Sequence, residues 1–247
     1  MCILVFRYET RMILEKGMYI VYNTHTFRNR GWQDLGNNVV IFGDSYSTFK
    51  GYVPDGYAIY YSEEASPDTD VTKVSETWWY QVAQEANWNL VLNNSWSGST
   101  ICYTGYDHVD CSEGNSFIYR WKQLIAGGFF VQNKIDKVFV FGGTNDSWAE
   151  APLGEVQFQD WKHEDLYCVL PAVCYFLHLI KETLPQADVY CLINTELKPE
   201  ITACMQDACQ KYGITPVTFD SIDKKSGHPT IEGMKNIKDS VLKVVCG

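Results

Sequence analysis

The sequence predicts an α/β fold in which helices cover both faces of a mainly parallel sheet. Short apolar runs alternate along the chain with longer segments whose apolar residues recur at helical spacing. The polar motifs come directly after these apolar runs or just before the last helical segment. Alternating strands and helices are typical of parallel sheets covered on both faces, and such sheets bind ligands at the carboxyl ends of their strands. We therefore expect about five strands, with a functional site at that edge.

Five apolar runs predict the strands, and five segments between and after them predict helices. The expected strands are residues 39–42, 90–93, 137–141, 188–193 and 215–219. The expected helices are residues 77–86, 116–126, 166–184, 199–212 and 230–245. Pro171 fits the first turn of the third helix, because a proline in the middle would cost about 3 kcal/mol. Gly213 is a stop signal for the fourth.

Length and composition favour one core. With 247 residues, of which 46% are hydrophobic, the chain can bury a substantial interior. We find no internal repeat and no linker, so residues 37–247 are expected to form a single domain. Residues 1–36 fit no core element and are expected to be an extension packed on that domain.

The charge balance and the apolar runs exclude several classes of protein. A net charge of −10 argues against a nucleic-acid groove, which needs clustered Lys and Arg. No apolar stretch approaches the length of a membrane span, and residues 3–6 are too short for a signal-peptide core. As written, the chain is expected to be cytoplasmic. A misassigned start, with Met18 as the other candidate, would leave an extracytoplasmic location open.

The cysteines do not indicate a metal site. Nine cysteines are present and none forms a C-x-x-C pair, so a structural zinc site is not expected. Cys102 and Cys111 could bridge a loop, but free thiols are the favoured interpretation in a chain too large to need a disulfide scaffold.

Ser45 is the candidate nucleophile. It stands in the tripeptide Gly43-Asp44-Ser45, directly after the first apolar run, where its hydroxyl would be exposed at the active end of the sheet. The same tripeptide also makes ordinary turns after strands. A hydroxyl nucleophile needs a base, a group that orients the base, and donors for the oxyanion, so the other motifs decide its meaning.

Two further segments can supply oxyanion donors. Residues 93–100 read Asn-Asn-Ser-Trp-Ser-Gly-Ser-Thr, and the backbone N–H of Gly98 could approach a ligand closely. Residues 142–146 read Gly-Gly-Thr-Asn-Asp, and the Asn145 side chain could present a neutral donor. Each segment can also be a polar turn.

His228 is the candidate general base, with Asp223 as its orienting carboxylate. Both lie in residues 223–229, just before the last predicted helix. A lone histidine in that position is usually a surface or capping residue. No other histidine has comparable neighbours, as the remaining ones show: His25, His108, His163 and His178.

Together the four segments resemble the SGNH hydrolases, also called the GDSL esterase/lipase superfamily. Its Ser, Gly, Asn and His blocks match Ser45, Gly98, Asn145 and His228 in order, over about residues 37–245. The resemblance implies a three-layer α/β/α fold of flavodoxin-like type. It also implies a serine-esterase mechanism in which the N–H groups of Ser45 and Gly98 and the Asn145 amide hold the oxyanion. No cofactor and no metal are implied.

One position departs from the superfamily pattern. The usual aspartate three residues before the histidine is here Lys225. Asp223 is the nearest acid and the favoured partner, while Asp220 is the second candidate. A Ser–His pair whose imidazole is oriented by a backbone carbonyl is the third.

Aromatic residues suggest the substrate. Tyr46, Trp96 and Trp148 each lie within three residues of a candidate site residue, so they could stack on sugar rings or hold acyl chains, or simply pack in the core. The long connection over residues 46–76 carries aromatics that either cover the core or line a pocket: Phe49, Tyr52, Tyr57, Tyr60 and Tyr61.

These features predict an esterase that hydrolyses carboxylic esters through an acyl-enzyme and that deacetylates an O-acylated carbohydrate or another small ester. An acyl thioesterase or lysophospholipase is the alternative enzyme, suggested by the second block. A non-catalytic carbohydrate-binding relative is the alternative outside enzymes. No nucleic acid or membrane partner is expected.

Overall fold

The computed structural model describes residues 14–15, 18–19, 36–64 and 66–246. Of the predicted extension, this includes a short antiparallel pair, β1 (Leu14–Glu15) and β2 (Met18–Tyr19), and Gly36. The rest of residues 1–36 lies outside the described part of the chain, so its predicted packing on the domain stays a prediction.

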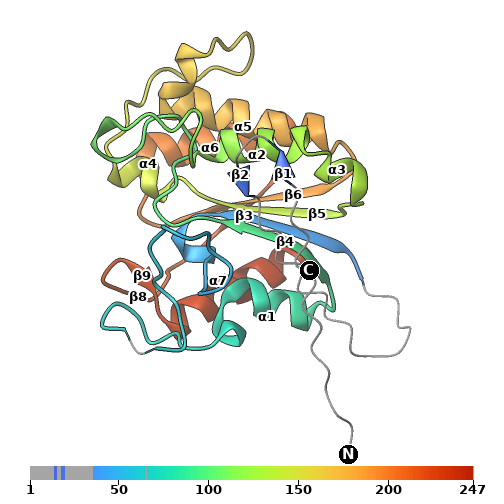
Figure 1. Ribbon diagram of the computed structural model, residues 1–247, viewed down its shortest axis with the longest axis vertical. Helices are drawn as coiled ribbons and strands as arrows, with labels where there is room; N and C mark the ends of the chain where they lie inside the picture. Colours follow the sequence, from blue (N-terminus) through green and yellow to red (C-terminus); the bar gives the residue numbers. More distant parts are fainter. Residues whose placement is uncertain (1–13, 16–17, 20–35, 65, 247) are drawn as a thin grey trace, which may run out of the picture.

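A single five-stranded sheet forms the centre of the molecule (Figure 1). Its strands are β3 (Asn38–Gly43), β4 (Asn89–Ser95), β5 (Lys137–Phe141), β6 (Asp188–Ile193) and β7 (Thr215–Thr218). All neighbouring pairs are parallel, in the order β4-β3-β5-β6-β7. The five predicted strands and the flavodoxin-like topology are confirmed. In this order the chain changes direction between β3 and β5, which is where open α/β sheets bind ligands.

Helices cover both faces, as predicted. One face carries α2 (Phe117–Ala126), α3 (Phe129–Gln132), α5 (Val169–Thr183) and α6 (Pro199–Tyr212), and the other carries α1 (Trp78–Glu85) and α7 (Ile231–Cys246) (Figure 1). Alternate residues of each strand enter the two cores, so Val40 and Phe42 pack under α2 and α5 while Val39 and Ile41 pack on the side of α1 and α7.

The helix boundaries follow the expected start and stop signals. The Ser116 side chain accepts a hydrogen bond from the Tyr119 backbone N–H and so caps α2. The predicted helix over residues 166–184 is divided into a 3-10 turn, η4 (Glu164–Tyr167), and α5, which places Pro171 in the first turn of α5 as predicted. Gly213 ends α6.

Short elements stand where the sequence indicated only loops. Ser45 begins a 3-10 turn, η1 (Ser45–Ser47), and Asn145 lies in a short helix, α4 (Thr144–Trp148). A small hairpin, β8 (Lys224–Lys225) and β9 (His228–Pro229), carries the candidate base. Packing of these loops, rather than local periodicity, orders them.

The thiols Cys102 and Cys111 are free, each directed at a backbone carbonyl: Cys102 at Thr104 and Cys111 at Val109. Among the described residues, no helix is long and apolar enough to cross a membrane.

Candidate active site

Ser45 and His228 meet at the carboxyl end of β3. The Ser45 hydroxyl lies 3.2 Å from Nε2 of His228, which is within hydrogen-bond reach for a nucleophile and its base. Both side chains are almost fully buried, with 3% and 5% of their surface exposed. The structure therefore brings together two predicted site residues that are far apart in the sequence.

The second nitrogen of His228 faces a backbone carbonyl, not a carboxylate. Nδ1 lies 3.3 Å from the Ser226 carbonyl oxygen. The Asp223 carboxylate instead accepts a hydrogen bond from the Thr230 hydroxyl, while the Asp223 carbonyl accepts one from the Thr230 N–H at 3.0 Å. The predicted pairing of Asp223 with His228 is absent from the described contacts, and so is a pairing with Asp220. The imidazole instead faces the backbone carbonyl of Ser226, which corresponds to the third alternative from the sequence, a Ser–His pair without an acidic partner.

Replacing Asp223 by asparagine is therefore expected to leave kcat/KM for a short ester within about threefold of the unchanged protein. A carboxylate that orients a catalytic histidine is worth about 10⁴ in kcat, so the two arrangements predict very different results. Steady-state hydrolysis of p-nitrophenyl acetate measures the effect, and Asp220→Asn is the matched control. A loss of a hundredfold or more in Asp223→Asn alone would reinstate Asp223 as the orienting acid.

Asn145 lies in α4, which follows β5, the strand next to β3, and its side-chain amide is held by two hydrogen bonds. Its Nδ2 donates to the Ser99 carbonyl at 3.0 Å, and its Oδ1 accepts from the Tyr106 hydroxyl at 2.9 Å. Burial raises the pKa of Tyr106 to about 12, so this hydroxyl keeps its proton at neutral pH. One amide N–H of Asn145 remains for a further acceptor. No sequence signal indicated Tyr106, because this residue comes from a loop without periodicity.

Gly98 lies in a tight loop, as predicted. Its φ of +76° is in the left-handed region that favours glycine, and a side chain there would be strained. The Asp146 carboxylate holds the far end of this loop by accepting from the backbone N–H groups of Ile101 and Cys102. In the described chain, no backbone hydrogen bond is donated by the N–H of Gly98 or Ser45.

Arg120, which sequence reasoning missed, connects the loop that precedes Ser45 to the loop that contains Gly98 through its hydrogen bonds. Its guanidinium donates to the Gly43 carbonyl at 3.2 Å, to the Asn94 carbonyl at 2.7 Å, to the Ser99 hydroxyl at 3.0 Å and to the Asn115 carbonyl at 3.0 Å. It is 2% exposed. The sequence did contain a signal, because Arg120 lies three residues after Phe117 and four before Leu124, two core residues on one face of α2.

Two ionisable side chains are buried near the Gly43-Asp44-Ser45 turn, those of Asp44 and Arg120. Burial raises the pKa of Asp44 to about 7, although its Oδ1 accepts from the Tyr46 N–H. Burial also lowers the pKa of Arg120 to about 9. The charge of Arg120 acts to lower the pKa of Asp44, and the charge of Asp44 acts to raise the pKa of Arg120, so each partly offsets the effect of burial on the other.

The aromatic residues near the site divide into three cases. Tyr46 has no exposed surface and donates its hydroxyl to the Gly227 carbonyl at 2.6 Å, so its predicted contact with substrate is corrected to a packing role. Trp96 is half-buried between Tyr57 and the Arg120 guanidinium. Trp148 is 40% exposed beside His228 and stays a candidate for substrate contact.

The long connection over residues 46–76 both covers the core and lines a cavity, the two roles that the sequence left open. Phe49 and Tyr61 are buried in the core on the α1 side, and Tyr52 packs on Trp79. Tyr57 lines a cavity, and Tyr60 stacks on His228.

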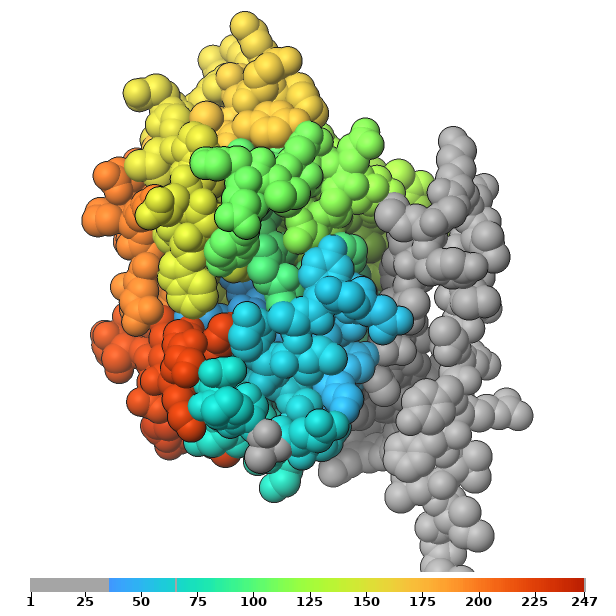
Figure 2. Space-filling model, turned by 60° about the vertical axis from the view of Figure 1, so that its left-hand side comes forward, coloured from blue at the N-terminus to red at the C-terminus, as the bar shows by residue number. Residues whose placement is uncertain are grey.

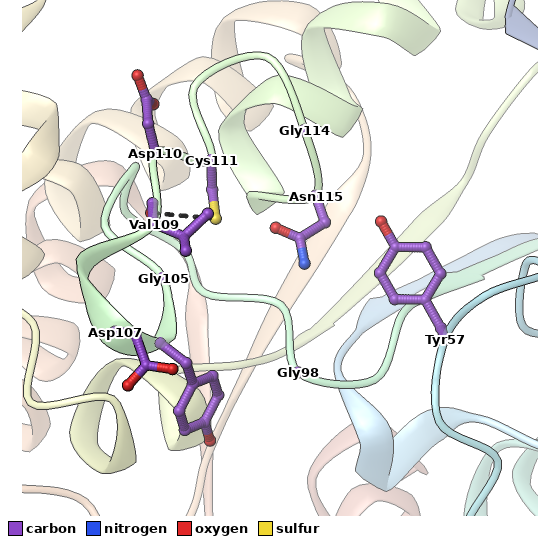
Figure 3. A pocket seen from close by; sticks show the side chains of 10 residues that line it. Tyr57, Gly98, Gly105, Asp107, Val109, Asp110, Cys111, Gly114 and Asn115 are labelled. Carbon is purple, nitrogen blue, oxygen red and sulfur yellow. Dashed lines mark hydrogen bonds between the residues drawn. The ribbon is translucent and has the colours of Figure 1, made fainter.

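A cavity of about 450 Å³ adjoins the loop that contains Gly98. Figure 3 shows Tyr57 and Gly98 on one side of it and the loop from Gly105 to Cys111 on the other. Asn115, just before α2, points into it. In Figure 2 the connection after η1 (cyan), this loop region (green), the segment around Trp148 (yellow) and the hairpin (red) meet around a recess in one face of the molecule. The described residues contain no cluster of three or more side chains that could hold a metal ion.

Comparison with known proteins identifies the family. A sequence model of the GDSL-like lipase/acylhydrolase family matches residues 37–245. The chain belongs to the GDSL-like lipase/acylhydrolase family. As a member of this family it is a hydrolase that acts on ester bonds. A search of curated proteins found no match.

Solved structures agree with the assignment to the GDSL-like family. A protein from Bacteroides ovatus described as a GDSL-like lipase is 42% identical, with 85% of this chain and 98% of that chain covered and a TM-score of 0.77. A second, from Bacteroides uniformis, is 43% identical over 85% and 95% of the two chains, also with a TM-score of 0.77. A family two carbohydrate esterase from Clostridium thermocellum, in complex with cellohexaose, is 16% identical over 85% of this chain and 64% of that one, with a TM-score of 0.56. That last likeness is one of fold alone.

Proposed function

We propose that this GDSL-like hydrolase is a serine esterase that uses Ser45 as nucleophile and His228 as general base. The observation that carries the proposal is the 3.2 Å contact between the Ser45 hydroxyl and Nε2 of His228, in a buried site. Burial lowers the pKa of His228, although the Ser226 carbonyl opposes this shift. The imidazole is therefore neutral at pH 7 and able to accept the serine proton.

The acylation step follows from this geometry. Ser45 Oγ attacks the ester carbonyl while its proton moves to Nε2 of His228. The carbonyl oxygen becomes an oxyanion, which the N–H groups of Ser45 and Gly98 and the free amide N–H of Asn145 stabilise. Because the amide is already fixed by Ser99 and Tyr106, it needs little reorganisation when the charge develops.

The intermediate then collapses. Its C–O bond to the alcohol breaks, and His228 gives the proton to the leaving alkoxide. Water next attacks the acyl-Ser45 ester with His228 again as base, which releases the carboxylic acid and restores the serine. The Ser45 proton thus leaves with the alcohol, and a proton taken from the attacking water restores the serine hydroxyl, so that His228 is neutral again at the end of the cycle.

A small acyl group on a carbohydrate is the substrate that we propose. Exposed aromatic rings border the site, namely Trp148 and Tyr106, each 40% exposed, and flat rings can stack on sugars. Tyr57, Asp107 and Asn115 add polar groups along the cavity. The cellohexaose complex of the carbohydrate esterase from Clostridium thermocellum is consistent with this class.

Labelling with a fluorophosphonate tests the mechanism. We expect one covalent adduct on the peptide that contains Ser45, detected by mass spectrometry, and its rate should fall strongly in His228→Ala. An unlabelled Ser45 in the folded protein would instead favour the non-catalytic binding relative.

A panel of p-nitrophenyl esters and O-acetylated sugars tests the substrate class. We expect kcat/KM to be highest for acetyl esters and to fall with chain length. A preference for long acyl chains or for thioesters would reject the proposed substrate and favour the thioesterase or lysophospholipase.

A further inference from the structure

The imidazole of His228 lies among aromatic rings. Tyr60 stacks on it, with ring centroids 3.7 Å apart and an interplanar angle of 21°. Three more rings surround it at larger distances and steeper angles: Tyr46 at 5.8 Å and 58°, Tyr61 at 6.3 Å and 74°, and Trp148 at 6.3 Å and 75°. Tyr60 is thus the one ring of the four that is nearly parallel to the imidazole.

The imidazole that Tyr60 stacks on is the one that has no carboxylate at Nδ1 among its described contacts. In a Ser–His–carboxylate site the acid holds the imidazole in one orientation and stabilises the imidazolium that forms during the reaction. Here Nδ1 faces the uncharged Ser226 carbonyl at 3.3 Å. A neutral carbonyl offers a cation less than a carboxylate does, so a second source of stabilisation is needed close to the ring.

The face of an aromatic ring is such a source. Its quadrupole attracts a cation within about 6 Å, most strongly where water is excluded. His228 is 5% exposed and Tyr60 is half-buried, so the imidazole side of the stack is shielded from solvent. The same contact limits rotation of the imidazole away from Ser45.

We propose that Tyr60 is a positioning residue for the general base, whose ring holds the imidazole plane and stabilises its protonated form in place of a carboxylate. This proposal rests on the proposed function, since it assigns a role in the same site. Tyr60 acts through His228 and transfers no proton itself.

Other groups also act on His228 and must be separated from Tyr60. The charge of Asp68 raises the pKa of His228 and that of Lys224 lowers it. Asp68 lies in the turn closed by Ser66 and Thr69, and Thr69 donates its hydroxyl to the Pro229 carbonyl at 3.2 Å. Tyr46, Tyr60 and Tyr61 are the titratable aromatic neighbours. A substitution of Tyr60 leaves the charges of Asp68 and Lys224 and the rings of Tyr46 and Tyr61 in place.

The experiment compares Tyr60→Leu with Tyr60→Phe and Tyr60→Trp. Leucine keeps an apolar cover over the imidazole but removes the aromatic face, whereas phenylalanine and tryptophan retain one. Tyr52→Leu is the matched control, because Tyr52 belongs to the same connection but packs on Trp79. NMR titration of the His228 imidazole, assigned by its absence in His228→Ala, reads the pKa independently of any ester. Melting temperatures identify variants that fail to fold.

We expect Tyr60→Leu to lower the pKa of His228 by about half a unit to one and a half units. Its kcat for p-nitrophenyl acetate should fall about three- to thirty-fold with KM unchanged. Tyr60→Phe, Tyr60→Trp and Tyr52→Leu should match the unchanged protein in both measurements.

Three results would overturn the proposal: a pKa of His228 that does not move in Tyr60→Leu, one that rises toward the ordinary value of histidine, or equal losses in Tyr60→Leu and Tyr60→Phe. A rising pKa would mean that Tyr60 only keeps water from the ring. If Ser45 is not labelled by the fluorophosphonate, the proposed function fails, while the NMR titration still decides the role of Tyr60.

Discussion

Ser45→Ala is expected to lower kcat for short p-nitrophenyl esters by about 10⁴-fold or more. The substitution removes the hydroxyl that His228 contacts at 3.2 Å, so no acyl-enzyme can form. The remaining oxyanion donors would still accelerate attack by water, which is why some activity above the uncatalysed rate should persist. Initial rates under saturating ester, together with loss of fluorophosphonate labelling, measure the effect.

Two comparisons make the Ser45 result specific. Ser62→Ala changes a serine in the connection after η1 whose hydroxyl bonds only its own turn, at Glu64, and it should leave kcat unchanged. His228→Ala should resemble Ser45→Ala, and the double variant should be little worse than either, because the two groups act as a unit. Ester hydrolysis by purified Ser45→Ala at the rate of the unchanged protein would reject the mechanism.

Arg120→Met is expected to destabilise the protein by about 3–5 kcal/mol, which corresponds to a melting temperature lower by roughly 10 °C. Methionine fills part of the space but removes the guanidinium N–H donors from the carbonyls of Gly43, Asn94 and Asn115, of which the Gly43 carbonyl keeps the Trp96 N–H as a donor. It also removes the positive charge close to Asp44. Because Arg120 holds the loops of Ser45 and Gly98 in one arrangement, kcat should fall as well.

Lys122→Met is the matched control for Arg120→Met. Lys122 is a half-buried cation on the same helix that donates to the Tyr103 hydroxyl at 3.2 Å, and its loss should cost less than about 1 kcal/mol. Thermal and urea unfolding compare the two variants under identical conditions. If both variants lost the same free energy of unfolding, the buried hydrogen bonds of Arg120 would contribute no more to stability than the single hydrogen bond of Lys122.

The strands and helices were predictable because each has a strong local signal. The runs Val138–Val140 and Val189–Ile193 are buried on both faces of the sheet and therefore read as continuous apolar segments. Pro171 and Gly213 marked helix boundaries through their own backbone restrictions. The small elements η1, α4 and the hairpin β8–β9 were not predictable, since contacts from distant segments order them.

The candidate site was predictable to a different degree. Ser45, Gly98, Asn145 and His228 each follow a strand or precede a helix, so the parallel topology alone brings them to one edge. Their partners carry no such positional signal. Tyr60 and Tyr106 come from loops whose paths depend on packing, and nothing in the spacing of Asp223 revealed that its carboxylate would contact Thr230.

The order of the reactive groups along the chain has a consequence for synthesis. Ser45, the proposed nucleophile, comes just after β3, the first strand of the central sheet, and the proposed base His228 stands 183 residues later, beyond the last strand of that sheet, which ends at Thr218. A growing chain can therefore complete its sheet while its serine is still chemically inert. The appearance of reactivity toward a fluorophosphonate would then show that the hairpin with His228 has packed against the sheet. The time at which it appears would measure when folding is complete.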